Sequence, residues 1–167
     1  MNAIQFLREM HADARLRLKS ILAAEHPSQA NQQWRALLPL LDIHEQLEDR
    51  YVYTPLASAM GPGTPLGDWA QRHASDVAMV RQLIAGVEDA PSGTPAWQMA
   101  VGRVADALNR HVMTEEGQIF GRIEQAWDSE RLEATGSEMR NQLRTVADKA
   151  GTRRRGAPTA GAAAAQG

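Results

Sequence analysis

Histidine and glutamate, two side chains that can bind metal, recur in a similar pattern in both halves of this 167-residue chain. In each half, a lone histidine is followed further along by a histidine with a glutamate four positions beyond it. Residues four apart on an α-helix lie on one face, so each pair can direct an imidazole and a carboxylate at one point. The first set is His11, His44 and Glu48, and the second is His73, His111 and Glu115.

All six side chains interrupt apolar stripes whose helical spacing marks a buried face. A single histidine on such a stripe is more often a hydrogen-bonded core residue than a ligand. Burying an ionised glutamate without a partner, however, is so costly that the group would normally lose its charge. Four histidines at matching depth, two of them paired with a glutamate, therefore predict a shared metal centre. His26 differs, because Pro27 marks a helix end there, and we expect an exposed loop residue.

Caps and breakers divide the chain into five expected helices, over residues 2–24, 29–54, 65–87, 95–126 and 129–150. Ser28, Thr64 and Thr94 are the expected caps of the second, third and fourth helices. The first four helices predict an all-α, up-down-up-down four-helix bundle with the polar groups at mid-height. We expect the fifth to be a shorter amphipathic helix that packs on the outside of the bundle. Its apolar residues, amid many charges, are Leu132, Met139, Leu143 and Val146.

Composition agrees with one domain over residues 1–150 and a disordered tail over 151–167, where Gly, Ala, Arg and Pro dominate. The formal charge of −2 gives no electrostatic reason to expect nucleic acid or a membrane surface as a partner. No segment approaches the ~20 apolar residues of a membrane span, so we expect a cytoplasmic protein. The absence of cysteine excludes disulfides and thiolate metal sites.

The order and intervals of these histidines and glutamates resemble the hemerythrin-like HHE cation-binding family over roughly residues 1–150. The resemblance implies a non-haem centre of two iron ions, bridged by oxo or hydroxo groups and by the carboxylates of Glu48 and Glu115. It also implies that His11 and His44 serve one iron, whereas His73 and His111 serve the other.

A further carboxylate follows directly after the second-helix histidine. The segment from residue 43 to 48 is similar to the hemerythrin-like domain of an F-box ubiquitin ligase subunit that senses iron and oxygen. That similarity implies Glu45 as a seventh ligand, with a water as the alternative. Trp69 and Val77 stand where oxygen-carrying hemerythrins have a second histidine, so one iron has a nitrogen ligand fewer.

The second bridging position has two neighbouring candidates, Glu115 and Glu116. Oxygen carriers bridge with an acid five residues after the last histidine, which here is Glu116. Helical geometry favours Glu115, because a fifth residue is turned roughly 140° from the starting face. Tyr51 lies three residues beyond Glu48 and is either a hydrogen-bond donor to the centre or an ordinary core tyrosine.

Mixed imidazole and carboxylate ligands suit iron, manganese, zinc, copper or nickel, and argue against calcium or magnesium. The leading interpretation is a di-iron protein that binds or reacts with dioxygen, peroxide or nitric oxide as a carrier, sensor or detoxifier. A catalase-like peroxide-removing enzyme, a di-iron oxidase and an iron-storage or structural metal protein are the alternatives. No phosphate-binding or dinucleotide motif competes with these interpretations.

Overall fold

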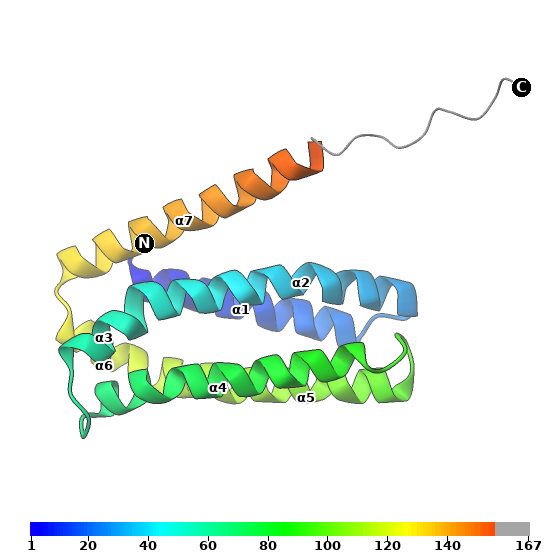
Figure 1. Cartoon of the computed structure of the whole chain (residues 1–167), viewed down its shortest axis with the longest axis horizontal. Coiled ribbons are helices and arrows are strands. Elements are labelled where there is room, and N and C mark those ends of the chain that lie inside the picture. The colour runs from blue at the N-terminus through cyan, green and yellow to red at the C-terminus, as the bar shows by residue number, and fades with distance from the viewer. Residues whose placement is uncertain (156–167) are drawn as a thin grey trace, which may run out of the picture.

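Four long antiparallel helices form a bundle in the computed structural model, which describes residues 1–155, with side chains described up to residue 146 (Figure 1). The four helices are α1 (Ala3–Leu22), α2 (Pro27–Glu48), α4 (Pro65–Glu88) and α5 (Pro95–Thr114). α1 packs along α2 and α4 along α5, so the bundle consists of two helical hairpins. The predicted all-α up-down-up-down bundle is confirmed.

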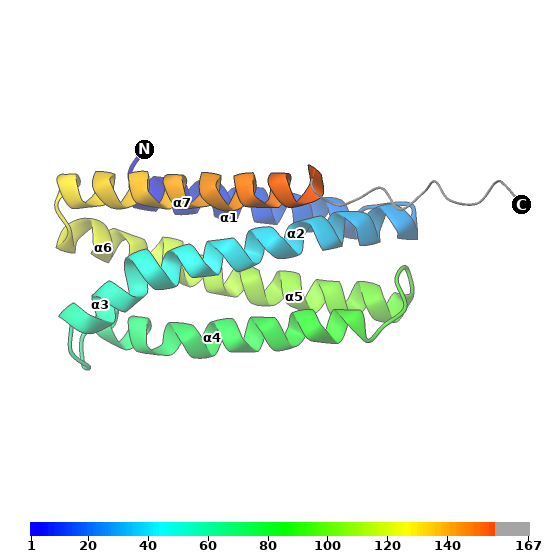
Figure 2. The ribbon, with the colours of Figure 1, turned by 45° about the horizontal axis from the view of Figure 1, so that its top comes forward.

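A fifth long helix, α7 (Ser129–Arg155), packs on the outside of the bundle against α1 and α2 (Figure 2). Its apolar stripe is the predicted one at Leu132 and Met139, which are both buried, whereas Val146 is 38% exposed. α7 continues past the expected boundary at residue 150. The rest of the predicted tail, residues 156–167, lies outside the described part of the chain.

Both motif-bearing helices change their winding at the end of the motif, directly after Glu48 in the first and at Glu115 in the second. α2 is followed by a π-helical segment, η1 (Asp49–Tyr53), and then by a short helix, α3 (Thr54–Ala59). α5 is followed in the same way by η2 (Glu115–Ile119) and α6 (Phe120–Ala126). We expected uninterrupted helices to residues 54 and 126. Each π-helical segment instead rotates the residues that follow it, and π segments of this length are often found at functional sites.

Hydrogen-bonded caps begin the two helices of the second hairpin as predicted. Thr64 accepts from the backbone N–H of Gly67, and Thr94 accepts from that of Trp97. The second helix starts earlier than expected, at Pro27 and not after Ser28, because proline already has the backbone angle of a first helical residue.

Two hydrophobic clusters fill the ends of the bundle and leave a polar layer between them. One contains Leu7, Leu47 and Phe120, and the other contains Trp34, Leu37 and Val101, all of them at most 2% exposed. His11, His44, His73 and His111 lie between these clusters. None of the described helices is long and apolar enough to cross a membrane.

Candidate metal centre

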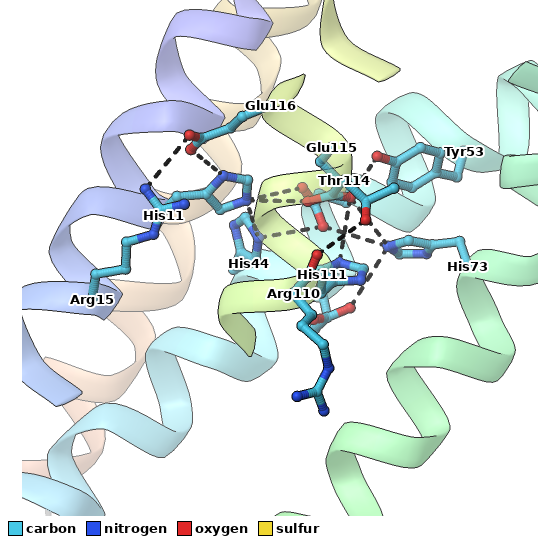
Figure 3. Close-up of polar contacts among 12 residues, drawn as sticks. His11, Arg15, His44, Tyr53, His73, Arg110, His111, Thr114, Glu115 and Glu116 are labelled. Atoms are coloured by element: carbon cyan, nitrogen blue, oxygen red, sulfur yellow. Dashed lines mark hydrogen bonds and ion pairs between the residues drawn. The ribbon is translucent and has the colours of Figure 1, made fainter. Parts of the chain in front are cut away.

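Six predicted side chains converge in the polar layer, one or two from each bundle helix (Figure 3). The four histidines are between 2% and 8% exposed, and both glutamates are 0% exposed. Two overlapping groups of possible ligand atoms form, each within 4.8 Å of one another. Two ligands on opposite sides of an ion at 2.1 Å lie roughly 4.2 Å apart, so each group has the size of one coordination sphere. The groups are His11, His44, Glu48 and Glu115, and then Glu48, His73, His111 and Glu115.

The first hairpin supplies the histidines of the first group. The Nε2 atoms of His11 and His44 are 3.1 Å apart, although one hydrogen bond at most can join two imidazole nitrogens. His11 Nε2 also lies 3.3 Å from Glu115 Oε2 and 3.6 Å from Glu48 Oε1. All these atoms point at one place, as the ligands of a single ion do.

The second hairpin supplies the histidines of the second group. His73 Nε2 lies 3.5 Å from Glu48 Oε2, and His111 Nε2 lies 3.4 Å from Glu115 Oε1. Each histidine pair therefore comes from one hairpin, whereas the two carboxylates are shared between the groups. The structure brings the histidines together in the same two pairs that the resemblance assigned to separate irons, and their binding of metal stays a prediction.

Several atoms of this layer are buried without a hydrogen-bond partner among the described residues. They include both carboxylate oxygens of Glu48, Oε2 of Glu115, and Nε2 of His73 and of His111. Unpaired buried polar atoms are costly, and a folded protein has few of them. A cation between the carboxylates and imidazoles would satisfy these atoms together, so the side chains present fit a metal centre.

The charges of the layer are balanced within it. Burial acts to raise the pKa of Glu48, but His44, His11 and His73 outweigh it and hold that pKa well below its ordinary value. Burial lowers the pKa of His11, but Glu115 and Glu48 outweigh it and raise that pKa to about 10. Without a cation, protons on imidazoles would thus balance the buried acids. A bound metal ion takes the place of those protons, so metal binding should release them.

Comparison with known proteins identifies the family. The family model for the hemerythrin HHE cation-binding domain matches residues 2–123. The chain belongs to the hemerythrin HHE family. A crystal structure of a hemerythrin HHE cation-binding domain-containing protein from Mycobacterium kansasii is similar, with a TM-score of 0.78 and 19% sequence identity, covering 93% of each chain. At this identity, the likeness supports the fold alone. No curated protein matches the chain in sequence.

Glu116, the neighbour of the shared Glu115, contacts His11 of this HHE domain from outside the polar layer. Its Oε1 accepts a hydrogen bond from His11 Nδ1 at 2.9 Å, and its Oε2 lies 3.5 Å from Arg15 Nη1 (Figure 3). Metal-binding histidines commonly donate their other ring N–H to a carboxylate, which fixes the ring's orientation. The structure thus gives the adjacent glutamates different places, with Glu115 inside the polar layer and Glu116 behind His11.

Tyr53, and not Tyr51, donates a hydrogen bond to the centre. The Tyr53 hydroxyl donates to Glu115 Oε1 at 2.5 Å, and its ring lies 4.0 Å from that of His73. Burial, Glu115 and Glu48 raise the pKa of Tyr53 well above its ordinary value, so the phenol keeps its proton. An α-helical reading of the sequence could not find Tyr53, because η1 winds more widely and brings the fifth residue after Glu48 to the inside.

Glu45 lies at the edge of the centre, beside the second group. Its Oε2 is buried 4.0 Å from His73 Nε2 and has no hydrogen-bond partner in the described part of the chain. Burial and the charge of Glu48 raise the pKa of Glu45. The two ligand groups of the HHE domain do not include it. Glu45 thus faces the His73 side of the centre, and its role as a seventh ligand stays a proposal.

Proposed function

We propose that this HHE domain holds two iron ions and binds or reacts with dioxygen, peroxide or nitric oxide. The observation that carries the proposal is that Glu48 and Glu115 belong to both ligand groups, because shared carboxylates hold two ions side by side. One ion would take His11 and His44, and the other would take His73 and His111. Adjacent iron ions supply two-electron redox chemistry and open coordination positions for a small oxidant.

The ligand set supports iron over metals with other preferences. Four imidazoles and two shared carboxylates provide more nitrogen than the ferritin-like di-iron sites, which are built mainly from glutamates. Calcium and magnesium prefer oxygen ligands. Imidazole and carboxylate together suit iron, and six protein side chains leave two six-coordinate ions with positions for exogenous ligands.

The direct test is metal analysis combined with an optical spectrum of protein purified from iron-supplemented cells. We expect about two irons per chain, one for each of the two groups of possible ligands. We also expect near-ultraviolet absorption of an oxo- or hydroxo-bridged ferric pair. One tightly bound zinc per chain without such bands would refute the di-iron proposal.

The same sample distinguishes a carrier, an enzyme and a structural protein by their spectra and their turnover of peroxide. A carrier changes its spectrum reversibly with oxygen and shows no turnover. A catalase-like enzyme releases oxygen from hydrogen peroxide repeatedly. A purely structural or storage site does neither.

Glu45 sets the charge of the centre if it is the seventh ligand. Two ferrous ions with two shared carboxylates keep two positive charges, and a third carboxylate leaves one. Glu45→Ala should therefore keep most of the iron but raise azide affinity, by roughly tenfold, because it frees a position and removes a repulsive charge. Spectroscopic azide titration measures the change.

Gln46→Ala is the matched control for this titration, since Gln46 is exposed and bonds to Asp42 on the same helix. We expect its azide affinity to equal that of the parent protein. An unchanged affinity in Glu45→Ala would show that Glu45 does not ligate the metal.

A further inference from the structure

A hollow of about 210 Å³ lies between the two hairpins, next to the metal centre but outside it. Helices α2 and α4 form most of its wall, and α5 contributes Leu108. Apart from Glu45 and the Asp42–Arg81 pair, the wall is entirely aliphatic. Its aliphatic side chains are Leu38, Leu41, Val77, Val80, Ile84 and Leu108.

Polar groups lie at two places in this wall. Asp42 and Arg81 are both exposed and form an ion pair at 3.6 Å, so the arginine charge is already matched. Glu45, in contrast, is largely buried and reaches toward His73. Glu45 and Val77 also line a second hollow of about 210 Å³, which His73 borders. A molecule in the aliphatic hollow with its polar end at Glu45 would therefore lie beside the second ligand group.

The chemistry of the wall defines the molecule. An aliphatic cavity of this size holds a small apolar group and is smaller than the usual pocket for a drug-sized ligand. A carboxylate can accept hydrogen bonds at both oxygens, so Glu45 can face the centre with Oε2 and still accept a bond from a ligand through the other. An anionic end would be repelled by the Glu45 carboxylate, which has no cationic partner in this wall, and a cationic end would be repelled by neighbouring metal ions. A neutral O–H donor on a short alkyl chain carries no net charge and avoids both repulsions.

We propose that the hollow between α2 and α4 binds short-chain alkyl hydroperoxides, with the alkyl chain on the aliphatic wall and the O–H donated to Glu45. The choice of a hydroperoxide rests on the proposed function, because an alkyl hydroperoxide is a peroxide that also carries an apolar chain. The binding geometry does not depend on the proposed function, since an alcohol has the same O–H donor and the same chain.

The test is a titration of the metal-loaded protein with 1-propanol, 1-butanol, 1-pentanol and 1-hexanol, followed by ligand-observed NMR. Each added methylene should tighten binding about fourfold until the chain fills the hollow. Pentanoate should bind more weakly than 1-pentanol. An affinity that does not rise with chain length, or pentanoate binding as tightly as 1-pentanol, would overturn the proposal.

Two tryptophan substitutions locate the site. Ile84 lines the hollow, whereas its neighbour Leu83 is similarly half-buried and does not line it. Ile84→Trp should fill the hollow and remove the gain in affinity with chain length, and Leu83→Trp should keep it. Circular dichroism verifies that both variants are folded, and the alcohol series on the parent protein decides the question if either is not.

Zinc-loaded protein allows the affinities for the alcohol and for the hydroperoxide to be compared, because zinc has no redox chemistry and leaves the O–O bond intact. Pentyl hydroperoxide should bind to it at least as tightly as 1-pentanol, and weaker binding would overturn the hydroperoxide as the ligand. If the alcohols bind but iron-loaded protein consumes no peroxide of any kind, the peroxide reaction in the proposed function fails, and the hydroperoxide fails with it as the ligand of the hollow. If hydrogen peroxide is consumed but no alcohol binds, the hollow proposal alone fails.

Discussion

His111→Ala should release metal and lower the melting temperature together. His111 is buried, and its Nε2 belongs to a ligand group shared with two carboxylates. A ligand present at a thousand times its dissociation constant stabilises the folded state by about 4 kcal/mol. For a chain of this size, its loss would lower the melting temperature by roughly 10 °C. Metal analysis and a thermal melt measure both effects, and His44→Ala should behave similarly.

The control for this experiment is His26→Ala. His26 is exposed, precedes α2 and makes no side-chain capping bond there. We expect metal content and melting temperature to stay at parent values. Equal losses in all three variants would show that the buried histidines are not the ligands.

Glu115→Gln should have the larger effect on metal content, because Glu115 belongs to both ligand groups. The amide keeps the shape of the side chain but cannot balance two ions, so we expect both irons to be lost. The neighbouring substitution, Glu116→Gln, removes only the carboxylate behind His11. Loss of such a supporting group typically weakens metal binding by roughly 10–100-fold, so Glu116→Gln should still load at high iron concentration.

Iron titration with a competing chelator distinguishes the two variants. It also decides which of the adjacent acids bridges the ions. Retention of both irons in Glu115→Gln, together with their loss in Glu116→Gln, would reverse the assignment.

The bundle and the convergence of its six buried histidines and glutamates were predictable because both follow from helical periodicity. The four-residue spacing in His44–Glu48 and His111–Glu115 fixes a common face, and the apolar neighbours place that face inside. Tyr53 was not predictable, because it reaches the centre only through the π-helical winding of η1, and nothing in the period of the apolar residues signals that change. The role of Glu116 was missed for a related reason, since it lies off the α-helical face and contacts His11 across the bundle.

Two boundary predictions failed, at Pro27 and at Pro55, whereas those at Pro65 and Pro95 were correct. The second helix was expected to end at residue 54, before Pro55, but the helical path continues through η1 into α3 and includes Pro55. The hollow beside Glu45 could not be predicted either. It depends on how far apart α2 and α4 lie, and a helical pattern specifies which residues face inward but not that distance.

The sharing of Glu48 and Glu115 also determines how the two hairpins are joined. Each hairpin contributes two histidines to one ligand group, yet its glutamate also reaches the group of the other hairpin. Two bound ions would therefore act as crosslinks between α1–α2 and α4–α5. To release an ion from all its ligands, the hairpins must separate, a sub-global opening that costs far more than a side-chain rotation. Metal exchange in this protein would then be slow for a mechanical reason, set by the opening of the bundle and not by the strength of any one bond to the metal.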